Sequence, residues 1–102
     1  MTGLSQDVWQ QIISIFKKYP SVTQVVLYGS RAKGNYRSGS DIDLTMKGDG
    51  INLKLLNKIT NDLDDLLLPY TFDLSIFAQI DNRDLIAHID RVGKVVYSVK
   101  EG

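Results

Sequence analysis

Segments of helical periodicity alternate along this chain with segments of strand character, and this alternation limits the possible folds more than any other feature. Apolar residues recur at helical spacing between Ser5 and Pro20 and again over residues 52–67 and 82–91, which predicts three helices. A short helical turn is expected at residues 31–33. β-Branched or strictly alternating segments predict four strands, over residues 23–28, 41–46, 72–76 and 94–99. This order favours a single sheet covered mainly by helices, in an α/β (α+β) fold.

The chain is short, and its length allows only one modest hydrophobic core. With 102 residues, we expect a single domain over residues 1–102. No apolar stretch approaches the roughly 18 residues of a membrane span, and the N-terminus does not resemble a secretory signal. The absence of cysteine excludes disulfides, thiolate zinc sites and cysteine nucleophiles. We therefore expect a cytoplasmic protein with no membrane partner.

The charges balance overall but are unevenly distributed along the chain. Twelve basic and twelve acidic residues give a net charge of zero, so we expect no direct binding to nucleic acid. Residues 1–40 carry five basic residues and one acidic residue, whereas residues 41–102 carry seven basic and eleven acidic ones. The change of sign falls between Arg37 and Asp41, where the residues suited to chemistry also lie.

Three aspartates lie on the polar faces of the two alternating strands. Asp41 and Asp43 share one face of the first strand, and Asp73 lies on the polar face of the strand over 72–76. If these strands are neighbours, the three carboxylates converge and repel one another unless a cation joins them. Oxygen ligands suit Mg²⁺, and two such ions can hold both ends of a phosphoryl transfer. The alternative is a merely solvated strand surface, which is less favoured because aspartate is uncommon within strands.

A Gly-Ser turn lies shortly before these aspartates. Gly29 and Ser30 follow a buried strand and open the short helical turn, so free backbone N–H groups and a hydroxyl could bind an anion. Arg31 and Lys33 add positive charge nearby, and which of them would reach a nucleotide stays open. A Gly-Ser turn alone is more often only a joint between a strand and a loop. Beside a metal-binding acid pair, however, it suits the binding of a nucleoside triphosphate.

The spacing of the two features resembles a known family signature. Gly29-Ser30, ten residues and then Asp41-Ile42-Asp43 resemble the motif of the DNA polymerase β-like nucleotidyltransferase superfamily. The longer string Gly-Ser-Arg-Ala-Lys-Gly followed by Ser-Asp-Ile-Asp-Leu, within residues 29–44, is similar to its minimal nucleotidyltransferase (MNT) branch. The resemblance implies a mixed sheet with helices packed mainly on one face, as in the polymerase β-like palm. No separate substrate-binding domain of the kind found in larger relatives is expected.

The resemblance also implies a reaction and a role for each motif residue. It implies ATP as the nucleotide, two Mg²⁺ ions, and transfer of AMP with release of pyrophosphate. Gly29 and Ser30 would hold the β- and γ-phosphates, and Asp41 and Asp43 would bind the metals. Asp73 would deprotonate the attacking hydroxyl or share a metal. Catalytic and metal-binding roles thus fall on the three aspartates, and nucleotide binding falls on Gly29, Ser30, Arg31 and Lys33.

The family implies a partner as well. MNT proteins similar to this chain are often encoded with a HEPN-domain protein, form hetero-oligomers with it, and act as antitoxins by adenylylating a tyrosine of this toxin. We therefore expect a protein adenylyltransferase of a toxin–antitoxin pair. A small-molecule nucleotidyltransferase of the aminoglycoside type and a non-catalytic module that neutralises its partner by binding are the alternatives.

Some conspicuous residues receive no catalytic role from the sequence. His88 lies on the last predicted helix, and a surface or capping position is favoured because no partner is near it in sequence. Leucines are more numerous at the end of the helix over 52–67 than one apolar stripe requires. Leu68 and Tyr70 are therefore candidates for a contact surface.

Overall fold

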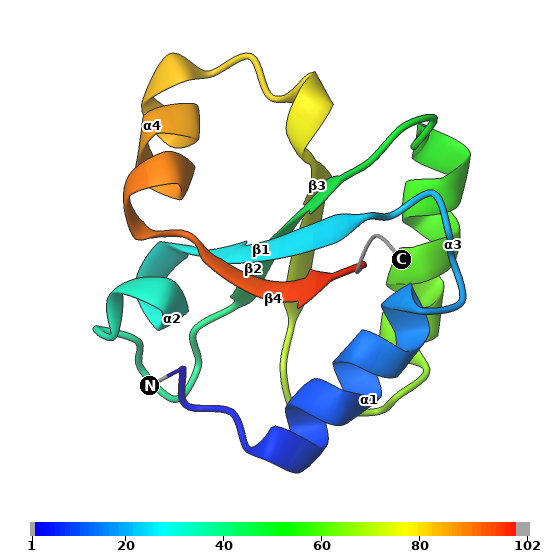
Figure 1. Ribbon diagram of the computed structural model, residues 1–102. Coiled ribbons are helices and arrows are strands. Elements are labelled where there is room, and N and C mark those ends of the chain that lie inside the picture. The colour runs from blue at the N-terminus through cyan, green and yellow to red at the C-terminus, as the bar shows by residue number, and fades with distance from the viewer. Residues whose placement is uncertain (1, 100–102) are drawn as a thin grey trace.

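The computed structural model describes residues 2–99 and is built on a mixed four-stranded sheet (Figure 1). The strands are β1 (Gln24–Tyr28), β2 (Ile42–Lys47), β3 (Phe72–Ile76) and β4 (Lys94–Ser98). Their order across the sheet is β3-β2-β1-β4. The central strand β1 runs antiparallel to both β2 and β4, whereas β2 and β3 are parallel. The expected mixed sheet is confirmed.

The helices are α1 (Gln6–Phe16), α2 (Gly29–Lys33), α3 (Leu53–Asp64) and α4 (Arg83–Val92), and a 3₁₀ helix covers Phe77–Gln79. Three of them begin at a polar side chain that accepts a hydrogen bond from a backbone N–H three residues later. These caps are Ser5, Asn52 and Asn82, and each satisfies a donor that has no partner within the helix. The predicted element order is confirmed, and within residues 2–99 the 3₁₀ helix is the one element that the sequence did not predict.

One face of the sheet carries the main core. Helices α1 and α3 lie together against this face (Figure 1). They cover alternate residues of the two central strands: Val25, Leu27, Ile42, Leu44 and Met46, all fully buried. Each such aliphatic side chain contributes about 1.5–3 kcal/mol when removed from water. The face covered by α1 and α3 therefore holds most of the buried apolar side chains.

The opposite face is covered in part by α4. Ile89 of α4 packs on Val26 and Tyr28 of β1 and forms a second, smaller apolar cluster. Gly93 allows this approach, because a Cβ atom there would lie 2.7 Å from Val26 Cγ1. The helices are thus mainly on one face, as expected, with α4 on the other. The polar residues of β2 and β3 lie on the same face as this second cluster.

Helix α3 ends earlier than the sequence predicts. The expected helix extended to Leu67, whereas α3 ends at Asp64 and the chain continues in tight turns closed by the N–H groups of Leu66 and Leu67. Leu67 has a φ of 56° and is 89% exposed. Successive leucines cannot all face one core, so the turn leaves Leu66 and Leu68 partly buried and Leu67 in solvent. Within residues 2–99, none of the helices has the length and apolarity needed to cross a membrane.

Candidate functional site

The parallel pairing of β2 and β3 brings two of the predicted aspartates side by side. Asp43 pairs in register with Asp73, and on the other side it pairs with Tyr28 of β1. These three residues therefore form one row across three strands, on the face that α4 only partly covers. Asp41 precedes β2 and is exposed, two residues from Asp43. The Asp43–Asp73 pair is the centre of the candidate site.

This row concentrates negative charge in a half-buried place. Burial raises the pKa of Asp43 from 3.8 to about 6, and the charges of Asp73 and Asp41 add to the rise. Burial also raises the pKa of Tyr28, as do the charges of Asp73 and Asp43, whereas a hydrogen bond with Ser75 lowers it. Uncompensated negative charge is therefore costly here, and a bound cation would relieve it.

The Gly-Ser turn lies directly against this carboxylate. Gly29 opens α2 with a φ of 75°, a conformation that favours glycine. A Cβ atom on Gly29 would collide with Oδ2 of Asp43. No side chain other than hydrogen fits at this position. The backbone that could bind phosphate and the carboxylate that could bind metal are thus in contact.

His88 supports the same turn from α4. The N–H of Gly29 donates a hydrogen bond to His88 Nε2 at 3.1 Å. The imidazole lies edge-on to the ring of Tyr28, with ring centres 6.3 Å apart and planes at 80°. His88 is half-buried, and the sequence did not connect it with the site. Its partner lies 59 residues away in the chain, and only the packing of α4 on β1 joins them.

Arg31 lies beneath the loop that leads to Asp41. Its side chain is only 2% exposed, and Nε and Nη2 donate hydrogen bonds to the carbonyl of Ser40 at 3.2 and 2.9 Å. Nη1 donates to the carbonyl of Thr2 at 3.1 Å. The rings of Tyr36 and Tyr70 each lie 5.2 Å from the guanidinium carbon. All three guanidinium nitrogens are engaged by the fold, whereas Lys33 on the same helix is exposed.

These contacts also locate the two residues that were candidates for a contact surface. Tyr70 is partly buried and contacts Arg31. Leu68 is partly buried against the main core. Both side chains contribute to the interior of this fold.

The donor set at the centre suits Mg²⁺ in its chemistry. The available ligands are carboxylate oxygens, which Mg²⁺ combines with water and substrate phosphates in octahedral coordination. Among residues 2–99, no three acidic, histidine or cysteine side chains are close enough to hold a metal ion by themselves. The aspartates fit a metal that arrives with a nucleotide and takes further ligands from it. Next to Asp43 on this face, the Thr45 hydroxyl is fully buried and lacks a hydrogen-bond partner.

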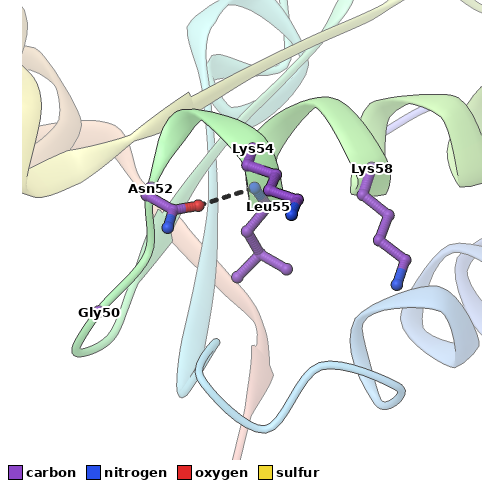
Figure 2. A pocket seen from close by; sticks show the side chains of 5 residues that line it. All are labelled: Gly50, Asn52, Lys54, Leu55 and Lys58. Carbon is purple, nitrogen blue, oxygen red and sulfur yellow. Dashed lines mark hydrogen bonds between the residues drawn. The ribbon is translucent and has the colours of Figure 1, made fainter.

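A pocket of about 290 Å³ lies elsewhere, at the beginning of α3 (Figure 2). It is lined by Gly50, Asn52, Lys54, Leu55 and Lys58. Figure 2 shows Asn52 capping the helix at the backbone of Leu55, with both lysines extending from α3. None of the site residues lines it. The candidate site is an open sheet face rather than this pocket.

The family model described as Polymerase beta, Nucleotidyltransferase matches residues 10–102. The match spans nearly the whole chain and includes the Gly-Ser turn and all three aspartates. The chain belongs to this nucleotidyltransferase family. No curated protein matches it in sequence.

Solved structures with the same fold include several toxin–antitoxin complexes. A crystal structure of a toxin–antitoxin with AMP-PNP has a TM-score of 0.74 and 19% identity, covering 90% of this chain and 74% of that one. A structure of the tri-AMPylated HEPN toxin of Shewanella oneidensis in complex with MNT antitoxin contains a chain that matches with a TM-score of 0.71 and 17% identity. The match covers 94% of this chain and 74% of that one. The toxin–antitoxin MntA-HepT gives 0.70 and 18%, covering 93% and 74%. At these identities, the likeness concerns the fold.

Proposed function

We propose that this protein is a Mg²⁺-dependent adenylyltransferase that transfers AMP from ATP to a tyrosine hydroxyl of a HEPN-domain partner. It would act in the cytoplasm as the antitoxin of a toxin–antitoxin pair, as a single minimal domain over residues 1–102. The observation that carries the proposal is the contact between Gly29 and the carboxylate of Asp43, which is itself paired with Asp73. Transfer from a nucleoside triphosphate needs groups that position the phosphates close to groups that hold metal ions, and this contact would provide both.

We assign the nucleotide to the Gly29-Ser30 turn. Because the Gly29 N–H already donates to His88, the Ser30 N–H and hydroxyl would hold the β- and γ-phosphates beside Gly29, and the exposed Lys33 would add positive charge. Arg31 would contribute from below, because its guanidinium holds the Ser40 carbonyl and so fixes the residue before Asp41. Asp41 and Asp43 would hold the metal ions. When bound, Mg²⁺ supplies neutralisation of the triphosphate and alignment of the attacking and leaving oxygens.

The reaction would be an in-line displacement at the α-phosphorus of ATP. The acceptor oxygen forms a bond to this phosphorus, and the bond from it to the α,β-bridging oxygen breaks, releasing pyrophosphate. The proton of the acceptor hydroxyl goes to a carboxylate. Asp73 is the candidate for this proton, since it is exposed and beside Asp43; sharing a metal is its alternative role. The pH profile of an Asp73→Asn variant separates the two.

The HEPN partner is proposed from the toxin–antitoxin complexes that share the fold. The Shewanella oneidensis HEPN toxin in one of these complexes is tri-AMPylated, which makes AMP transfer to a HEPN protein the first reaction to test.

The test is incubation of the purified protein and its HEPN partner with labelled ATP and Mg²⁺. We expect label on the partner with the wild-type protein and none with an Asp41→Asn, Asp43→Asn double variant. Asp49→Asn is the matched control, because Asp49 is an exposed acid in the turn after β2. Equal labelling by the double variant would refute the proposed site. Label on an added hydroxyl compound instead would favour a small-molecule enzyme, and neutralisation without ATP binding would favour a non-catalytic module.

A further inference from the structure

We infer that His88 is a positioning residue that holds Gly29 in the conformation needed by the nucleotide-binding turn. The inference deepens the proposed function and rests on it. It is carried by the hydrogen bond from the Gly29 N–H to His88 Nε2, at 3.1 Å. Through this bond, α4 becomes part of the site although it contributes none of the three site aspartates, Asp41, Asp43 and Asp73.

The imidazole is held in place by its surroundings. The next residue on α4, Ile89, is 3% exposed and packs on Val26 and Tyr28. The imidazole itself lies edge-on to the ring of Tyr28. Tyr28 is the residue directly before Gly29 in the chain. His88 thus contacts the last residue of β1 and the first residue of α2 together. A side chain fixed at both contacts can define where the chain turns from strand to helix.

Gly29 needs such an external support. Glycine visits left-handed and right-handed conformations about equally well, so its φ of 75° is not enforced by its own sterics. Its N–H lies in the first turn of α2, where backbone donors lack partners within the helix. His88 supplies that partner. The bond restrains the peptide that contacts Asp43, and it also commits the Gly29 N–H to His88 rather than to a phosphate.

The bond sets the form of the imidazole ring. Nε2 must present a lone pair in order to accept, so the neutral ring carries its hydrogen on Nδ1. A residue without an acceptor at this position would leave Gly29 free to move relative to Asp43. Since transfer depends on accurate placement of the triphosphate, both nucleotide affinity and turnover should suffer.

Two variants separate this role from a purely structural one. His88→Phe keeps a ring beside Tyr28 but has no acceptor, whereas His88→Gln restores an acceptor oxygen on a flexible chain. Asp90→Asn, at an exposed position of the same helix, is the control. We expect His88→Phe to speed hydrogen exchange of the Gly29 amide and to weaken ATP·Mg²⁺ binding, each by about tenfold, as loss of one hydrogen bond implies. His88→Gln should recover a substantial part of both, and Asp90→Asn should match the wild type.

The readouts distinguish failure of this inference from failure of the proposed function. In wild-type protein without nucleotide, NMR should detect scalar coupling between the Gly29 nitrogen and His88 Nε2 across the hydrogen bond, and this measurement needs no variant to fold. Absence of that coupling, or unchanged Gly29 exchange in a folded His88→Phe variant, would overturn the inference. Equal losses in His88→Phe and His88→Gln would also overturn it. A wild-type protein that shows the coupling but binds no ATP would instead refute the proposed function.

Discussion

Replacing Asp43 by asparagine should stabilise the metal-free protein at neutral pH, although it removes a residue central to the site. Burial and the charges of Asp73 and Asp41 raise the pKa of Asp43 from 3.8 to about 6. The folded protein therefore binds the proton of Asp43 more tightly than the unfolded chain does. The resulting stability is fully present below about pH 3.8 and is lost as the pH rises through about 6. At pH 8, the ionised Asp43 opposes folding.

The magnitude follows from the two pKa values. A rise from 3.8 to about 6 corresponds to about 3 kcal/mol of unfolding free energy between acid and neutral pH. Asp43 is only half-buried, so solvent screening reduces the expected effect to roughly 1–2 kcal/mol. Asparagine has nearly the same shape and cannot ionise. The stability of Asp43→Asn relative to the wild type should therefore grow from near zero at about pH 4 to roughly 1–2 kcal/mol at pH 8.

The assay is urea denaturation of both proteins with a chelator present, at several pH values between 4 and 8. Carboxylates that do not interact with Asp43 contribute equally to both proteins, so the difference between the two curves reports Asp43 together with its repulsion by Asp73 and Asp41. Asp49→Asn makes the same chemical change at an exposed position and is the control. Parallel pH profiles for Asp43→Asn and the wild type, or a less stable variant at pH 8, would refute the electrostatic reasoning.

Three further substitutions test the contacts around the site. Gly29→Ala should lower ATP affinity at least tenfold and destabilise the fold by about 1–3 kcal/mol, because the new Cβ atom would collide with Asp43. Calorimetric titration measures the affinity and urea denaturation the stability. Wild-type values in both assays would contradict the geometry. Thr45→Val should stabilise the protein by about 1 kcal/mol, because it removes a buried hydroxyl that has no hydrogen-bond partner. The melting temperature should rise by roughly 4–8 °C. A fall in melting temperature would show that the hydroxyl does have a hydrogen-bond partner. Arg31→Lys should lower the free energy of unfolding measured in urea by about 2–3 kcal/mol, because lysine keeps the charge but cannot bind the carbonyls of Ser40 and Thr2 together. A decrease below about 0.5 kcal/mol would mean that these guanidinium hydrogen bonds contribute little to stability.

Features that depend on the local periodicity of polar and apolar residues could be predicted from the sequence. Alternation of polar and apolar residues placed Asp43 and Asp73 on polar strand faces, and it does so regardless of which strands are neighbours. Helical spacing of apolar residues located three helices, and the structure caps them at Ser5, Asn52 and Asn82. The sequence predicts too late an end for α3, because several leucines in a row extend the apolar pattern beyond the point where the core can accommodate them.

The contacts that define the site were decided only by the tertiary structure. The alternation of polar and apolar residues along each strand does not by itself show that Asp43 lies opposite Asp73. The register depends on which strands pair and how they align. The sequence pattern also does not distinguish an Arg31 that faces a ligand from one buried under the Ser40 carbonyl. The bond between Gly29 and His88 joins residues whose proximity results from the packing of α4 on β1. The sequence by itself determined the element order and the candidate chemistry, because these depend on neighbouring residues in the chain. Packing decided which residues meet, because distant segments come together only when the whole sheet and its helices bury a common core.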